Sequence, residues 1–230
     1  MLEGIGKALQ DALVGKETAE PSAPAASPLL NAQRRRILEY LSLRPFTTAG
    51  KIAGDLKMSS SSALWHLRSL VSGGYVVYRH DDRVYFPKDF VDPADAGLFI
   101  TLRTPKRRDA LRSIMESPGI SQVELSGAMN ASRQTASKVA SELEKLGLVT
   151  VAKDGRFTRL YPTNALREKQ EKQHLRSRAF VERVLTRLDD ERQMPQVLRR
   201  TETELQIRIG KGRGKGVLWI PLDPYGTLVN

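Results

Sequence analysis

The sequence predicts a mainly α-helical protein with small β-hairpins, an α+β fold, in which one structural unit occurs twice. Three observations predict it. Residues 34–78 align without a gap on residues 107–151, at a constant offset of 73. Both segments place apolar residues at helical spacing between capping residues. Each segment also runs into two short strand-like stretches around a polar turn.

The identical residues occur both at turns and in the expected hydrophobic core, so chance does not account for the alignment. Identical pairs include Arg34/Arg107, Pro45/Pro118, Gly54/Gly127, Ser59/Ser132, Leu70/Leu143 and Gly74/Gly147.

Residues 1–29 precede the repeat and carry a net charge of −2. The segment Leu2–Val14 predicts an amphipathic helix, and residues 17–28, rich in Ala, Ser and Pro, predict a flexible linker. Such a helix is expected to dock on its own chain or on a partner. A membrane anchor is the weaker alternative, because the charges are mixed and net negative. The apolar face consists of Leu2, Ile5, Leu9, Ala12 and Leu13.

Residues 30–92 form the first copy. A helix with an apolar stripe stops near Pro45, and Thr47 or Thr48 caps the next helix. Ser59 or Ser60 caps a third helix, which ends at Gly73 and Gly74. Strands are expected over 75–78 and 83–86, around the polar turn His80-Asp81-Asp82.

Residues 93–163 form the second copy. Its helices are expected over 110–115, 122–129 and 132–146, followed by strands over 148–152 and 156–161. The Asp154-Gly155 pair between those strands is a hairpin turn signal. Three helices followed by a β-hairpin is the plan of a winged helix-turn-helix domain, so the sequence predicts two such domains in tandem.

The remaining residues predict a long helix and a terminal β-hairpin. A helix over 164–193, within a segment 164–195, has a narrow apolar stripe that favours packing on a partner helix, from the same chain or from a second protomer. It would set the spacing of the two domains or form a dimer. Residues 196–230 predict a basic hairpin, with strands over 205–209 and 217–222 flanking a glycine-rich loop over 210–216.

Composition indicates the class of partner. With 37 Lys and Arg against 26 Asp and Glu, the net charge is +11, which favours nucleic acid first and an acidic membrane second. The first copy carries +4, the second +4 and residues 164–230 carry +5, so the charge belongs to the folded body rather than to a tail.

Several functions are not expected. Without cysteine, disulfide scaffolds and thiolate metal sites are excluded, and three scattered histidines make an imidazole site improbable. No cofactor, metal or catalytic constellation is expected, so the chain is not predicted to be an enzyme. Neither a transmembrane helix nor a signal peptide is expected, which predicts a cytoplasmic protein without a membrane partner.

The candidate contacts to duplex DNA lie on the third helix of each copy, on the wings and on the terminal loop. Solvated helix faces and solvated hairpin tips are the alternative interpretation of these polar residues. Trp65 either faces DNA or packs on a neighbouring element, and the sequence leaves both open. The third-helix candidates are Ser60, Ser61, Ser62, Trp65 and Arg68 in the first copy and Arg133, Gln134, Ser137 and Lys138 in the second. The candidates on the wings and the loop are Arg79, Arg83, Lys153, Arg156, Arg159, Lys211, Arg213 and Lys215.

The stretch Ser59 to Val76, with Trp65-His66-Leu67-Arg68 and Gly74-Tyr75-Val76, resembles the third helix and first wing strand of ArsR-like regulators. Residues 132–149 are similar to MarR-like regulators. The whole arrangement resembles the tandem winged-helix transcription regulators common among archaea. Because the chain has no cysteine, it departs from the metal-sensing ArsR members.

This resemblance implies a DNA-binding transcriptional regulator that recognises duplex DNA through tandem winged helices and works at the nucleoid. A homodimer through 164–193 and contacts with the transcription machinery are further expectations. The alternative function is a winged-helix protein-interaction module of a transcription or chromosome-organising complex, for which the apolar Leu64 and Trp65 are a hint.

Overall fold

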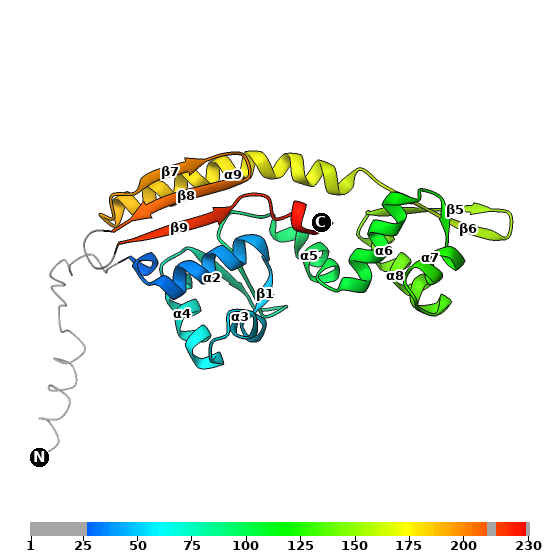
Figure 1. Cartoon of the computed structure of the whole chain (residues 1–230), viewed down its shortest axis with the longest axis horizontal. Coiled ribbons are helices and arrows are strands. Elements are labelled where there is room, and N and C mark those ends of the chain that lie inside the picture. The colour runs from blue at the N-terminus through cyan, green and yellow to red at the C-terminus, as the bar shows by residue number, and fades with distance from the viewer. Residues whose placement is uncertain (1–26, 211–214, 229–230) are drawn as a thin grey trace, which may run out of the picture.

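The computed structural model describes residues 27–210 and 215–228 of the chain. They form an elongated molecule with the two copies at opposite ends, and the C-terminal segment returns to the first copy (Figure 1). The helix predicted at Leu2–Val14 lies outside the described residues.

The first copy has the predicted helices and hairpin plus a third, two-residue strand. Its sheet is antiparallel in the order β1-β3-β2. Of the caps left open by the sequence, Thr48 and Ser59 are the ones whose side chains accept the capping bonds. The elements are η1 (Pro28–Leu30), α2 (Ala32–Leu43), β1 (Thr47–Thr48), α3 (Ala49–Asp55), α4 (Ser60–Ser72), β2 (Val76–Arg79) and β3 (Val84–Pro87).

The second copy repeats this plan with the sheet order β4-β6-β5. Its three helices begin and end 73 residues after those of the first copy, which confirms the duplicated unit. Even the left-handed turn recurs, with φ of +68° at Gly74 and +69° at Gly147, a conformation that favours glycine. The elements are α6 (Pro105–Glu116), β4 (Ile120–Ser121), α7 (Gln122–Ala128), α8 (Arg133–Lys145), β5 (Val149–Asp154) and β6 (Phe157–Pro162).

A short connection, η2 (Pro93–Asp95) and α5 (Ala96–Leu102), fixes the second copy to the first. The Phe99 ring of α5 packs 5.6 Å from that of Phe46 in the first copy. Arg103, directly after α5, donates from Nη2 to the Pro45 and Phe46 carbonyl oxygens at 3.2 and 2.5 Å. These contacts join the copies through buried aromatic rings and backbone hydrogen bonds.

The C-terminal third consists of one long helix and a three-stranded sheet. The predicted hairpin is confirmed as β8–β9, but the prediction omitted β7, which adds a third strand in the order β7-β8-β9. All five residues of β7 are exposed, so it lacks the alternation of buried side chains by which a strand is recognised. The elements are α9 (Ala165–Asp190), β7 (Gln196–Arg200), β8 (Glu204–Ile209), β9 (Gly216–Pro221) and η4 (Gly226–Leu228).

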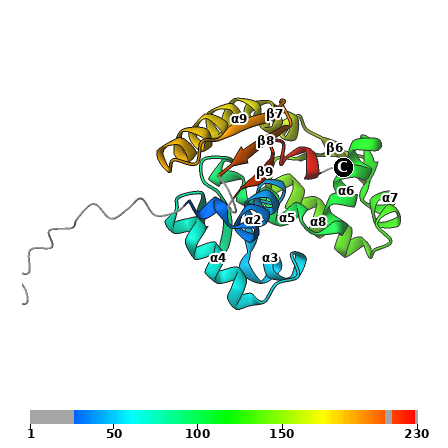
Figure 2. The ribbon, with the colours of Figure 1, turned by 60° about the vertical axis from the view of Figure 1, so that its left-hand side comes forward.

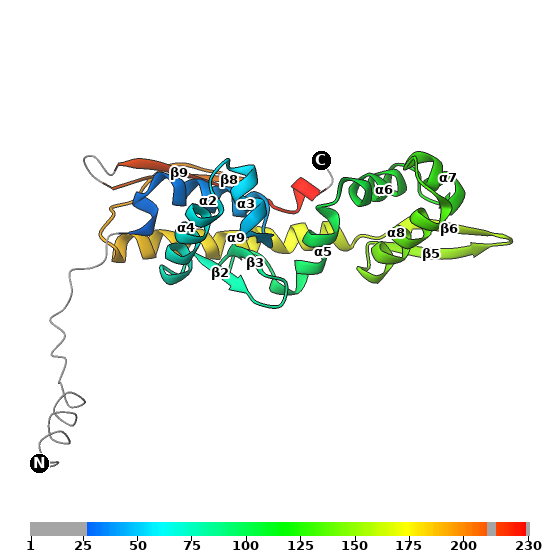
Figure 3. The ribbon, with the colours of Figure 1, turned by 90° about the horizontal axis from the view of Figure 1, so that it is seen from below.

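Helix α9 runs back from the second copy along the first (Figure 3), and its buried stripe packs within the same chain. The Phe180 ring lies 4.7 Å from that of Phe90. Gln173 Nε2 donates to the Phe90 carbonyl at 3.0 Å, and Ser177 Oγ donates to the Leu222 carbonyl at 2.9 Å. The stripe is thus covered by the loop after the first wing and by the chain after β9, not by a partner helix. A homodimer through 164–193 stays a prediction and has to use the exposed remainder of the helix.

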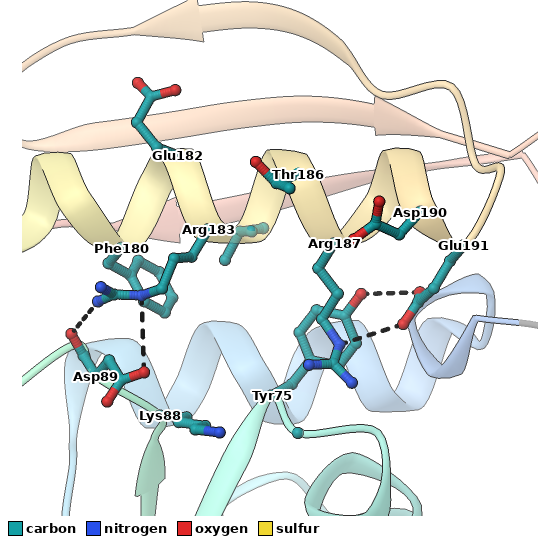
Figure 4. A pocket seen from close by; sticks show the side chains of 12 residues that line it. Tyr75, Lys88, Asp89, Phe180, Glu182, Arg183, Thr186, Arg187, Asp190 and Glu191 are labelled. Carbon is teal, nitrogen blue, oxygen red and sulfur yellow. Dashed lines mark hydrogen bonds and ion pairs between the residues drawn. The ribbon is translucent and has the colours of Figure 1, made fainter.

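The end of α9 is held to the first copy by charged groups around a cavity (Figure 4). The Tyr75 hydroxyl donates to Glu191 Oε2 at 2.9 Å, and Arg187 Nε lies 3.3 Å from Glu191 Oε1. Arg183 Nη2 donates to the Asp89 carbonyl at 3.0 Å. Burial, reinforced by the Glu191 carboxylate, raises the pKa of Tyr75 above its usual range, so its hydroxyl remains a donor at neutral pH.

Strand β9 is covered along its free edge by α2. The Trp219 backbone N–H donates to Glu39 Oε1 at 3.2 Å, and the Arg35 guanidinium lies where a side chain at Gly216 would begin. The Thr227 hydroxyl donates to the Leu43 carbonyl at 3.2 Å. The C-terminal sheet is therefore part of the first copy's packing.

Candidate nucleic-acid interface

Helix α8 of the second copy presents the predicted polar residues on one face. Ser132 caps the helix, because its Oγ accepts from the Thr135 backbone N–H at 3.2 Å. Four residues at helical spacing point into the core, namely Ala136, Val139, Ala140 and Leu143. The opposite face is exposed and consists of Arg133, Gln134, Ser137 and Lys138.

The outward groups of α8 are available to a ligand. Within the described part of the chain, Arg133, Gln134 and Ser137 have no side-chain hydrogen bond or ion pair. The helix's own carboxylate at Glu142 is engaged, since Arg107 Nε donates to Glu142 Oε2 at 2.5 Å. That bond holds the pKa of Glu142 below its usual range. The exposed N-terminal half of α8 thus carries donors and positive charge.

The second wing extends beyond the body of the molecule (Figure 3). Five of the six residues of β5 are exposed, and Lys153 and Arg156 lie near the tip of the hairpin. The exposed Phe157 ring is covered by the guanidinium groups of Arg156 at 5.1 Å and Arg159 at 5.5 Å. Phe157 is not among the DNA contacts predicted from the sequence. The signal was present, since an aromatic residue directly follows one arginine and shares its strand face with another.

Arg159 has a structural role in addition to its place on the wing. Its Nη1 donates to the Gly119 carbonyl at 3.2 Å, and its Nε lies 3.2 Å from Asp154 Oδ2. The side chain therefore ties the wing to the turn before β4. Lys153 and Arg156 are the freer basic groups of this wing.

The first copy presents a different third helix. Ser60, Ser61 and Arg68 are exposed and Ser62 is half-buried, all on α4. Trp65 faces solvent with 59% of its surface exposed, and the guanidinium of Arg34 lies 4.8 Å from the centre of its ring.

The first wing is engaged with its own surroundings. Arg79 donates to the Pro93 carbonyl at 3.0 Å, pairs with Asp82 and lies over the Phe46 ring. All four residues of β3 are buried, whereas Arg83 in the turn is exposed. Directly before β9, Lys215 is exposed, while Lys211 and Arg213 lie outside the described residues. The structure thus groups the third-helix candidates of each copy on its own helix, α8 or α4, and the second-wing candidates on one hairpin.

His66 lies under the exposed face of α4, with 5% of its surface exposed and no hydrogen-bond partner for its Nδ1 within the described residues. Burial, and then the positive charge of Arg34, lowers the pKa of His66 from its ordinary 6.5. Below about pH 6.5 the His66 side chain is therefore protonated more readily in the unfolded chain than in the native state.

We expect stability to fall as the pH is lowered through the range just below 6.5, because the unfolded state then binds more protons than the native state. His66→Gln should flatten this dependence. Urea unfolding at pH 7.5 and 5.5 measures it, and His80→Gln at an exposed histidine is the matched control. An equal pH dependence in the two variants would contradict the assignment to His66.

No group of three or more acidic or histidine side chains in the described ranges is placed to hold a metal ion. None of the helices in those ranges is both long and apolar enough to cross a membrane.

Comparison with known families agrees with the fold of each copy. Residues 30–77 match the model of winged helix-turn-helix DNA-binding domains, and residues 103–156 match that of the MarR family. No curated protein matches the sequence.

Two solved structures are partly similar to the chain. MarR has 22% identity and a TM-score of 0.28, over 44% of this chain and 88% of its own. ScpB from Mycobacterium tuberculosis has 16% identity and a TM-score of 0.25, over 59% of this chain and 92% of its own. At these TM-scores neither structure describes the arrangement of the whole chain.

The two matched segments, each with three helices and a wing, define a tandem winged helix-turn-helix DNA-binding protein. The second copy is similar to the MarR family over residues 103–156 only, and the two matched segments together make the chain a DNA-binding transcriptional regulator.

Proposed function

We propose that the second copy reads the DNA sequence. In this arrangement α8 lies in the major groove, with Arg133 and Gln134 at base edges and Ser137 and Lys138 toward the phosphates. Arginine pairs with guanine and glutamine with adenine through two hydrogen bonds each, and such a pair discriminates between bases by about 1–3 kcal/mol. The observation that carries the proposal is the exposed, unpaired outward face of α8.

The second wing supplies contacts outside the major groove in this proposal. Lys153 and Arg156 are exposed near the hairpin tip and meet phosphates or the adjacent minor groove. Arg159 supports them by fixing the wing to the turn at Gly119. The wing therefore adds affinity and orientation, while α8 adds sequence preference.

The first copy and the C-terminal segment position the protein on DNA. Helix α9 fixes the spacing of the two copies, and a homodimer would place further copies along the duplex. We assign the chain no enzymatic activity and place it in the cytoplasm, at the nucleoid, with the transcription machinery as a further partner. Arg79 is held by the Pro93 carbonyl and by Asp82 and is left out of these contacts. The phosphate contacts outside the second copy are Ser60, Ser61, Ser62, Arg68, Arg83, Lys211, Arg213 and Lys215.

A second function, protein contact, is favoured for the first copy by the exposed apolar side chains on α4. Leu64 and Trp65 are exposed where a DNA-reading helix usually carries polar groups. Protein contact through α4 is compatible with sequence reading through α8, because these two helices belong to different copies.

We expect duplex affinity to fall steeply with salt, since phosphate contacts by Lys and Arg release counterions. Six to ten such contacts correspond to a loss of roughly 10³–10⁵-fold between 50 and 200 mM salt. Fluorescence anisotropy with a duplex selected from a random-sequence pool measures the slope, and Arg156→Ala should reduce it by about one. A slope near zero, or a pool that yields no enriched sequence, would overturn the proposal.

A further inference from the structure

Helix α4 carries an exposed surface that base contact does not explain. We call it the α4 patch: Leu64, Trp65, Arg68 and Val71, with Arg34 of α2 beside Trp65. Leu64 and Val71 are each 37% exposed and Trp65 59%. Helix α4 lies on the side of the first copy away from the C-terminal sheet (Figure 2).

The second copy shows that the fold does not require this apolar character. The residues 73 positions later on α8 fold in the same way and are all polar, namely Ser137, Lys138, Ser141 and Glu144. One copy therefore presents a hydrophilic outer helix face and the other a largely apolar one. Exposed apolar residues grouped on one face are typical of a protein-contact surface.

In the described part of the chain, Arg34 of the patch lacks the carboxylate partner that the equivalent arginine of the second copy has. In the second copy Arg107 is bonded to Glu142, but the position equivalent to Glu142 in the first copy is Ser69. Within the described residues no carboxylate pairs with Arg34, whose buried Nε lacks a hydrogen-bond partner. The neighbouring His66 Nδ1 also lacks one. A segment that combines apolar side chains with an acidic one would complement both features of the α4 patch.

The described part of the chain begins beside the C-terminal end of α4. The described residues begin at Ser27, and Pro28 lies against Gly73, at the C-terminal end of α4. The sequence before Ser27 combines the predicted apolar helix face of Leu2–Val14 with a linker that contains Glu17 and Glu20. The twelve residues from 15 to 26 span up to about 40 Å, whereas α4 is about 20 Å long.

We propose that Leu2–Val14 docks as an amphipathic helix on the α4 patch of its own chain. Its apolar face covers Leu64, Trp65 and Val71, and a linker carboxylate, Glu17 or Glu20, pairs with Arg34. The net charge of −2 on residues 1–29 complements Arg34 and Arg68. The docked segment covers the third helix of the first copy and competes there with duplex DNA, a consequence that rests on the proposed function.

Disulfide trapping tests the docking directly, because the chain has no cysteine of its own. We expect Leu9→Cys with Leu64→Cys to form an intrachain disulfide under mild oxidation, seen as faster migration on a non-reducing gel and as a linked peptide by mass spectrometry. Leu9→Cys with Ser137→Cys, the equivalent position of the second copy, is the matched control. Disulfides mainly between chains, or equal trapping in both variants, would overturn the proposal.

Tryptophan emission gives a second readout without DNA. In a Trp219→Phe background, Trp65 is the remaining tryptophan. Ile5→Asp with Leu9→Asp should move its emission to longer wavelength as the ring becomes solvated. Unchanged emission would show that residues 2–14 do not shield Trp65 from solvent, and would overturn the docking.

Duplex affinity separates this proposal from the proposed function. The Ile5→Asp, Leu9→Asp chain should bind duplex several-fold more tightly than the native chain, if the first copy contacts DNA. Trapping in the first pair alone, with unchanged duplex affinity, would support the docking and overturn DNA contact by the first copy. Loss of the salt slope with intact trapping would overturn the proposed function alone.

Discussion

Arg133→Ala combined with Gln134→Ala should abolish most of the sequence preference of this protein. The two side chains project from the first turn of α8 without partners in the described residues, so their removal leaves the fold of the second copy intact. With about 1–3 kcal/mol for each bidentate base contact, affinity for the preferred duplex should fall at least tenfold. Binding to unrelated duplexes should change little, because phosphate contacts dominate it.

A competition experiment between the preferred duplex and an unrelated duplex measures the ratio of the two affinities, which is the sequence preference. The internal repeat provides the matched control, since Ser60→Ala with Ser61→Ala changes the equivalent positions of α4. This control should keep the preference. A larger loss in the α4 variant than in the α8 variant would mean that the first copy reads the sequence.

Phe180→Ala should lower the free energy of unfolding by about 3–5 kcal/mol, the usual effect of deleting a buried aromatic ring. Phe180 is 3% exposed and packs on Phe90, at the contact between α9 and the first copy. Removal of the Phe180 ring would leave a cavity between α9 and the loop that carries Phe90, two segments that are far apart in sequence.

Chemical denaturation measures this change, and Leu175→Ala is the control on the same helix. Leu175 is 69% exposed, so its truncation should change stability by no more than about 0.5 kcal/mol. Equal effects of the two substitutions would show that α9 does not depend on its packing against the first copy.

The two copies were predictable because their signals are local. Capping residues, turn residues and helical spacing lie within about 50 residues and occur twice, so each copy supports the interpretation of the other. The helices of both copies accordingly begin and end at the same offset of 73. Helix α9 was also predictable, from its length and its late apolar stripe.

What covers α9 was not predictable, because its partners are distant in sequence. Gln173 bonds to Phe90 and Ser177 to Leu222, and neither pairing leaves a local pattern. Strand β7 was not predicted, because its sequence lacks the local pattern of a half-buried strand. All its residues are exposed, including the apolar Val197 and Leu198, so buried and exposed positions do not alternate.

The candidate site was partly predictable. Residue type and position identified the four outward residues of α8, whereas the engagement of Arg79 and Arg159 by nearby backbone carbonyls needs the three-dimensional structure. Phe157 was within reach of sequence reasoning, through its place between two arginines. Arg107 has a carboxylate partner in Glu142, whereas Arg34 at the equivalent position has none in the described residues. This difference could not be predicted from the sequence, because the Arg107–Glu142 contact is visible only in the structure.

The return of the C-terminal sheet to the first copy has a consequence for synthesis on the ribosome. The second copy has all its elements once residue 162 has emerged, but the first copy lacks its cover until β9 and η4 follow. The half of the protein that is made first is therefore the last to be completed, the reverse of the usual N-terminal-first order. A premature stop codon after residue 195 would leave the second copy whole and expose the α2 surface that β9 normally covers.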